Sequence, residues 1–87
     1  MDPARLATRV LELLTTIAPD VDPASVLPGV DFRDQFDFDS MDTLNFAIAL
    51  SRELGVEVPE TDYSRLASLD ECVAYLGSRL TGRDSSG

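Results

Sequence analysis

The sequence predicts an all-α fold, a four-helix bundle with a long loop between the first and second helices and a short third helix. Three observations support this prediction. Apolar residues recur at helical spacing in three segments of the 87-residue chain. Residues typical of helix starts and ends flank these segments. Neither an alternating strand pattern nor an internal repeat is evident.

The first helix is expected from Pro3 to about Ala18. Asp2 is a good N-cap, and Pro3 suits the first helical position because the N–H that it lacks would be unpaired there anyway. The apolar residues of the segment follow the period of a helix. They are Leu6, Val10, Leu13, Leu14 and Ile17.

The segment from Pro19 to Asp39 is expected to be a long loop, because it contains three prolines, a glycine and several aspartates. A loop of this length in a compact domain usually has a function. Its apolar residues are expected to attach it to the core. They are Val26, Leu27, Val30, Phe32, Phe36 and Phe38.

The second helix is expected from Ser40 to Leu54, with Asp39 as its N-cap and Gly55 as the left-handed residue that ends it. Apolar residues cover much of its circumference, so that it can bury one face and still present apolar groups to a partner. One side carries Met41, Leu44, Ile48 and Leu54, and another carries Phe46, Ala47, Ala49 and Leu50.

A short helical turn is expected from about Thr61 to Leu66. Ser68 and Glu71 then form a capping-box pattern that opens a last helix through about Leu80. The inner stripe of that helix is expected to contain Leu69, Cys72, Val73, Leu76 and Leu80. We therefore predict one domain over residues 1–80 and a flexible C-terminal tail over residues 81–87.

The composition excludes several classes of function. The formal net charge is -9, with 16 acidic residues against 7 arginines and no lysine. Nucleic acids and anionic membranes are unfavourable partners for such a chain, because they are bound by clustered basic residues. The single cysteine cannot form an internal disulfide, and no signal peptide or membrane-spanning run is evident. A cytoplasmic monomer is the expectation.

The side chains also argue against an enzyme. There is no histidine, which removes the commonest general base near neutral pH and most zinc sites. Cys72 lies in the inner stripe of the last helix and is expected to be a buried structural thiol. The aspartates between Asp31 and Asp42 lack the glycine and terminal glutamate of an EF-hand, so no metal site is predicted.

The informative segment is Phe36-Asp37-Phe38-Asp39-Ser40-Met41-Asp42, in which a serine opens the second helix between two acids. Here the sequence resembles an acyl carrier protein, a phosphopantetheine-binding family whose corresponding motif is Asp-Ser-Leu-Asp. The resemblance extends from about Phe32 to Leu76 and more loosely over the first helix. It is also carried by Gly55, Val58-Pro59 and Tyr75.

The resemblance implies an acyl-carrier-type bundle in which Ser40 receives phosphopantetheine from coenzyme A. A separate phosphopantetheinyl transferase performs that loading, with magnesium needed only for this step. Acyl groups then form thioesters on the thiol of the arm and pass between an acyl-loading ligase or acyltransferase and acyl-using enzymes. The elementary chemistry agrees, since a phosphodiester in the first turn of a helix lies near unpaired N–H groups.

The flanking residues have two interpretations each. Asp39 is an N-cap, a carboxylate that helps to bind the magnesium used in loading, or both. Asp42 either complements the helix dipole or contacts a basic patch of the transferase. Met41 is interpreted as a partner contact rather than core. Further candidates are a partner interface at Leu44, Asn45, Ile48 and Arg52, and an acyl pocket at Leu50, Tyr63 and Leu66.

Departures from the family pattern suggest a specialised stand-alone carrier. Asn45, Ser51 and Arg52 stand where carriers of fatty-acid synthesis usually have acids, and Phe38 replaces a small residue. The expected pathway is a secondary fatty-acid, lipid or polyketide-like one. A peptidyl or aminoacyl carrier using the same serine is an alternative. An unmodified acidic helical adaptor, in which Ser40 is dispensable, is another.

Overall fold

The computed structural model describes residues 2–86, and the side chains of residues 2–80. The described residues contain helices and no strand, which confirms the predicted all-α class. The elements, in chain order, are α1 (Pro3–Ile17), η1 (Pro23–Ser25), α2 (Phe32–Gln35), α3 (Ser40–Leu54), η2 (Glu60–Leu66) and α4 (Leu69–Ser86). The four predicted helices correspond to α1, α3, η2 and α4.

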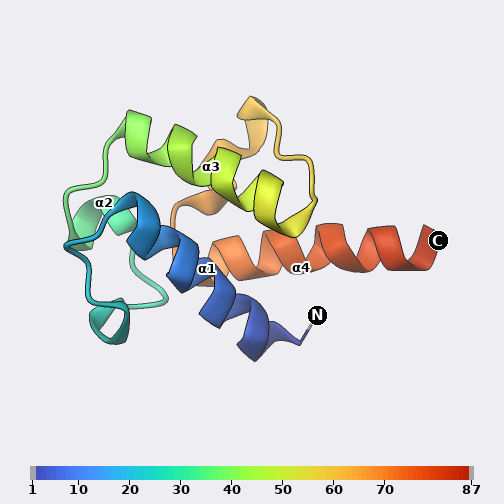
Figure 1. Ribbon diagram of the computed structural model, residues 1–87, viewed down its shortest axis with the longest axis horizontal. Coiled ribbons are helices and arrows are strands. Elements are labelled where there is room, and N and C mark those ends of the chain that lie inside the picture. Colours follow the sequence, from blue (N-terminus) through green and yellow to red (C-terminus); the bar gives the residue numbers. More distant parts are fainter. Residues whose placement is uncertain (1, 87) are drawn as a thin grey trace.

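The core lies between the three long helices, with α1 packed against both α3 and α4, and with η2 bridging α3 and α4. Figure 1 shows that the start of α3 lies toward one end of the long axis, whereas α1 begins and α4 ends toward the other. The largest fully buried side chains are Phe32, Phe46, Leu6, Leu14, Leu50, Leu66, Leu76, Val10 and Cys72.

The helix ends follow the predicted signals. The Asp2 carboxylate accepts a hydrogen bond from the Ala4 N–H at 3.4 Å at the start of α1. The Ser68 hydroxyl accepts one from the Glu71 N–H at 3.2 Å at the start of α4, which is the first half of the predicted capping box. Gly55 ends α3 in the left-handed conformation, with φ of 67°.

Gly55→Ala is expected to lower the free energy of unfolding by about 1–2 kcal/mol, because a Cβ disfavours the left-handed conformation. Gly77→Ala is the matched control inside α4. There the added Cβ would meet Leu6 Cδ2 at an ordinary 3.8 Å, and alanine is the better helix former by about 1 kcal/mol. Urea unfolding gives the free energy of unfolding of both variants. Equal losses for Gly55→Ala and Gly77→Ala would contradict the role of the left-handed conformation at Gly55.

The predicted loop is more ordered than expected, since it contains both η1 and the single-turn helix α2. Gln35 holds it in shape: its amide accepts a hydrogen bond from the Leu27 N–H at 2.7 Å and donates to the Leu27 and Val30 carbonyls at 2.9 and 2.8 Å. The expectation that Leu27 attaches the loop to the core was wrong, because Leu27 is 55% exposed. Phe32 and Phe38 are the buried attachments.

The end of α4 also differs from the expected boundary. The helical backbone continues to Ser86 rather than ending near Leu80. The side chains of residues 81–87 lie outside the described part of the chain. The flexible tail over residues 81–87 and the domain boundary at residue 80 therefore stay predictions.

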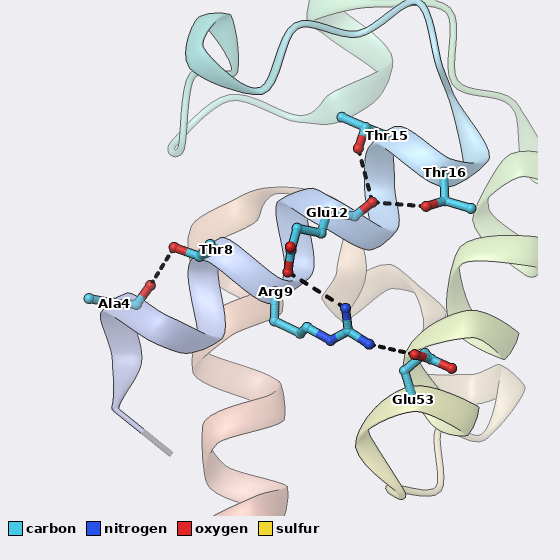
Figure 2. A network of polar contacts seen from close by, with 7 residues as sticks. All are labelled: Ala4, Thr8, Arg9, Glu12, Thr15, Thr16 and Glu53. Atoms are coloured by element: carbon cyan, nitrogen blue, oxygen red, sulfur yellow. Dashed lines mark hydrogen bonds and ion pairs between the residues drawn. The ribbon is translucent and has the colours of Figure 1, made fainter.

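A polar network on α1 links this helix to α3 (Figure 2). The Arg9 guanidinium forms an ion pair with Glu12 one turn later, at 3.6 Å, and a second one with Glu53 near the end of α3. Both partners are largely solvent-exposed, so screening limits what these ion pairs add to stability. Only the pair with Glu53 joins α1 to α3, at the end of α3 that lies away from Ser40.

Cys72 is fully buried on α4, as expected of a structural thiol. Burial raises the pKa of this thiol from 9.0 to about 12. The unfolded chain therefore loses this proton from about pH 9 while the folded chain keeps it. The free energy of unfolding should fall as the pH rises from about 9 to 12, by up to about 1.4 kcal/mol per pH unit.

Urea unfolding at pH 8 and pH 10 measures this fall. In the Cys72→Ala variant, the free energy of unfolding should decrease less between pH 8 and pH 10, because the thiol no longer contributes. The same slope in both proteins would show that the thiol does not cause it.

Candidate functional site

Ser40 is the first residue of α3, and its side chain is exposed. A reciprocal capping box holds the backbone here. The Asp39 carboxylate accepts a hydrogen bond from the Asp42 N–H at 2.9 Å, and the Asp42 carboxylate accepts one from the Asp39 N–H at 3.2 Å. The sequence predicted Asp39 as the N-cap but missed the return bond from Asp42. The hydroxyl of Ser40 therefore projects from a rigid first turn.

Asp39→Ala is expected to cost about 1 kcal/mol of stability, because it leaves an N–H of the first turn of α3 without its cap. Asp39→Asn keeps an oxygen for the cap and should retain most of the stability. If Asp39 also helps to bind magnesium in loading, Asp39→Asn should be loaded more slowly than wild type despite its intact fold. Thermal melts measure the change in stability, and the rate of phosphopantetheine loading measures the role of Asp39 in that step.

Asp37→Asn is the control, since this exposed aspartate makes no hydrogen bond or ion pair among the described residues. If Asp39→Asn is loaded as fast as wild type, Asp39 acts only as the N-cap of α3 and not in loading.

The first turn of α3 is suited to a phosphate. Its unpaired N–H groups and the positive end of the helix dipole favour an anion bonded to the first residue. The surface cavity beside Ser40 is lined by one cation, Arg33, and by two carboxylates, Asp31 and Glu71. An exposed hydroxyl at the start of a capped helix therefore fits a covalently attached phosphate ester through the helix N-terminus and not through the net charge of the cavity.

The cavity at Ser40 has a volume of about 530 Å³ and lies between α2, the start of α3 and η2. Tyr63 and Leu66, two of the three predicted pocket residues, line it, whereas the third, Leu50, is fully buried and is not part of the lining. The remaining lining residues are Asp31, Arg33, Phe38, Thr43, Ser64, Ala67 and Glu71. No local sequence signal marked these, because they come from three separate segments.

The η2 segment forms one wall of the cavity, and polar contacts connect it to α4. The Tyr75 hydroxyl donates a hydrogen bond to Asp62 at 2.7 Å, and Arg79 forms an ion pair with the same carboxylate at 2.7 Å. Burial, together with the hydrogen bond to Asp62, raises the pKa of Tyr75. The hydroxyl thus stays protonated at neutral pH and keeps donating to Asp62.

Four of the five predicted partner residues are exposed as a stripe along one side of α3, and the fifth, Leu44, lies at its border with the core. Met41 is 61% exposed and Ile48 is 48% exposed. Asn45 and Arg52 are also exposed, and Leu44 is partly buried. These five residues recur at three- and four-residue intervals from Ser40 onward, so they share a face with the start of the helix. The structure thus brings the serine and the candidate interface onto one surface.

No group of three or more acidic or cysteine side chains in the described part of the chain is arranged to hold a metal ion. No described helix combines the length and the apolar character needed to cross a membrane.

Comparison with known families identifies the chain. A family model described as "Phosphopantetheine attachment site" matches residues 6–76, a range that includes Ser40 and the walls of its cavity. The chain belongs to the acyl carrier proteins of this phosphopantetheine-binding family. Such a carrier has a covalently attached phosphopantetheine group and is not an enzyme. Acyl carrier proteins interact with a phosphopantetheinyl transferase and with acyl-using enzymes.

Curated relatives bear the same description. "Acyl carrier protein 2, mitochondrial" of Arabidopsis thaliana is 30% identical over 78 residues, which cover 90% of this chain and 61% of the relative. "Acyl carrier protein" of Thermosynechococcus vestitus is 28% identical over 76 residues, covering 84% and 94%. "Acyl carrier protein, mitochondrial" of Neurospora crassa is 26% identical, covering 83% and 54%. The chain thus spans only part of the length of two of these three relatives.

Proposed function

We propose that Ser40 is the attachment residue of this acyl carrier protein. The observation that carries the proposal is the position of Ser40, an exposed hydroxyl at the first residue of a capped 15-residue helix, inside the matched range. In loading, a bond forms between Ser40 Oγ and the phosphorus of phosphopantetheine, the pyrophosphate bond of coenzyme A breaks, adenosine 3′,5′-bisphosphate leaves, and the hydroxyl proton passes to a base of the transferase or to water. The terminal thiol of the attached group then supplies the thioester chemistry.

The proposed role is to hold acyl groups for partner enzymes in a specialised fatty-acid, lipid or polyketide-like pathway. The α3 stripe supports this proposal through its composition. Asn45 and Arg52 are exposed there, and neither carries a negative charge. The stripe is therefore a weak attractor for a positively charged partner surface. We infer that its apolar side chains contribute more than charge to the choice of partner. The partners are an acyl-loading ligase or acyltransferase and acyl-using enzymes, and Asp39, Met41 and Asp42 contact the transferase.

A monomeric carrier in the cytoplasm is part of the same proposal. The buried thiol and the high negative charge support a monomer in a reducing compartment. Two of the relatives named above carry the word mitochondrial in their names. Sedimentation of the purified chain and fractionation of the source cells test these two points.

The attachment site is tested by mass spectrometry. The chain is incubated with coenzyme A, magnesium and a broad-specificity phosphopantetheinyl transferase, and the intact mass is measured. The expected result is the addition of one phosphopantetheine group, which fragmentation of the proteolysed product places on Ser40. A group found on another serine would overturn the assignment.

A further inference from the structure

A second surface groove lies between the end of α1 and the loop that leads to α3, and it shares no lining residue with the cavity at Ser40. This loop groove has a volume of about 700 Å³. Leu27 lines it and is 55% exposed, one of three large apolar side chains that are exposed in the described part of the chain. The other large apolar side chains of the lining are partly buried. They are Ile17, Val21, Val26 and Phe36.

Hydrogen bonds to its backbone hold Leu27 in this exposed position. Gln35, which also lines the loop groove, bonds to both the N–H and the carbonyl of Leu27, at 2.7 and 2.9 Å. A partner that covers Leu27 therefore removes apolar surface from water without first having to order this part of the loop. The loop groove is suited to receive an apolar side chain.

The charged residues of the loop groove are all negative. Four carboxylates line it, and no arginine does. None of the four forms an ion pair within the described part of the chain. They belong to Asp20, Asp22, Asp37 and Asp42. The segment from Pro19 to Asp42 contains seven aspartates and one arginine, so the surrounding chain strengthens this negative potential.

The apolar lining and the carboxylates together select one kind of occupant. The carboxylates attract Lys or Arg side chains and repel anionic lipids and nucleic acids. The apolar lining favours an apolar side chain over a hydrated metal ion or a polyamine. A second copy of this chain is unfavourable, because its net charge is -9. The fitting occupant is a segment of another protein in which basic residues flank an apolar one.

We propose that the loop groove is a docking site for a basic segment of a partner protein, which inserts an apolar side chain next to Leu27. Asp42 connects this site to the first turn of α3, because it lines the loop groove and caps the turn that begins with Ser40. The docking site is distinct from the α3 stripe, since none of the five stripe residues lines the loop groove. The proposal does not depend on the attachment at Ser40.

The test uses the unloaded chain and short peptides as probes. The first peptide is a basic, apolar hexapeptide, Arg-Leu-Arg-Arg-Leu-Arg, with blocked ends. Two control peptides replace its leucines by serine or its arginines by glutamate. Backbone amide NMR shifts are followed during titration at about 0.1 M salt, where the Debye length of about 10 Å limits the effect of distant charges.

The basic, apolar peptide should cause saturable shifts of the Val21, Val26 and Leu27 amides. The serine peptide should bind at least about threefold more weakly, because it buries no apolar side chain. The glutamate peptide should leave these amides unchanged, because the carboxylates of the loop groove repel it.

A first pair of variants tests the apolar contact. Leu27→Ser should raise the dissociation constant of the basic, apolar peptide about fivefold. Ile48→Ser is the control, because it removes a similarly exposed apolar side chain from α3, and it should change the constant by less than about twofold.

A second pair of variants tests the charges. The double variant Asp20→Asn, Asp37→Asn should raise the dissociation constant about fivefold. The double variant Glu57→Gln, Glu60→Gln removes the same charge from exposed residues that do not line the loop groove. Its effect should stay below about twofold.

Three results would refute the docking site. They are the absence of saturable shifts with the basic, apolar peptide at millimolar concentration, shifts centred on Met41 and Ile48 instead, and equal effects within either pair of folded variants. Circular dichroism verifies the fold of each variant, and the wild-type titration decides the proposal even where a variant does not fold. Ser40 is tested separately by the mass of the loaded chain, so the two failures are distinguishable.

Discussion

Ser40→Ala is expected to take up no phosphopantetheine under conditions that load the wild-type chain completely. The variant lacks the only oxygen that the proposed site offers for the phosphodiester. Its fold should survive, because Ser40 is exposed, its hydroxyl makes no hydrogen bond among the described residues, and alanine is a good helix former. A change in stability within about 0.5 kcal/mol is expected. Intact mass and circular dichroism measure the two effects.

Ser64→Ala is the matched control for this loss. Ser64 is a second exposed serine in the lining of the same cavity, and its removal should leave loading complete. Uptake of phosphopantetheine by Ser40→Ala would refute the attachment site. The pair also tests the adaptor alternative, because an unmodified adaptor would keep its function in cells without the Ser40 hydroxyl, whereas a carrier would lose it.

Phe46→Ala is expected to cause the largest loss of stability, about 3–5 kcal/mol. Phe46 is fully buried and packs against Phe32 and Phe38, each with a centroid separation of 6.0 Å. Removal of the ring leaves a cavity where α3 meets the loop. A small domain has a total stability of about 5–15 kcal/mol at most, so the variant should be partly unfolded at 37 °C. Urea unfolding followed by circular dichroism gives the value.

Phe36→Ala provides the comparison within the same group of rings. This ring packs on Phe32 with a centroid separation of 5.6 Å but is only partly buried. Its removal should cost less than half of the loss at Phe46, because water can fill part of the space. Similar losses at the two positions would mean that the loop, rather than the helical core, limits stability.

The sequence predicted the local features of the fold well, because short-range interactions determine them. Asp2, Asp39 and Gly55 act on backbone groups within four residues, so their roles follow from the order of residues alone. The short helix η2 was expected from Thr61 to Leu66 and begins one residue earlier. The exposed stripe on α3 was also predictable, because the helical period separates its residues from those that face the core.

The cavity and the conformation of the loop were not predictable from local patterns. Gln35 closes the loop on residues five and eight positions away, and the Phe32 N–H donates to the Ala67 carbonyl at 2.8 Å, across 35 positions. Such contacts depend on how the helices pack. For the same reason Leu50, which shares a helix with Ser40, was expected in the pocket, whereas Arg33 was not noticed.

The placement of the helix ends bears on how this carrier can be joined to other molecules. The start of α3 lies toward one end of the long axis, while α1 begins and α4 ends toward the opposite end (Figure 1). A tag, a linker or a solid support attached at either terminus thus leaves Ser40 open to enzymes. The same geometry is compatible with a carrier tethered inside a larger chain, where neighbouring domains connect on the side away from the start of α3 and catalytic partners approach Ser40.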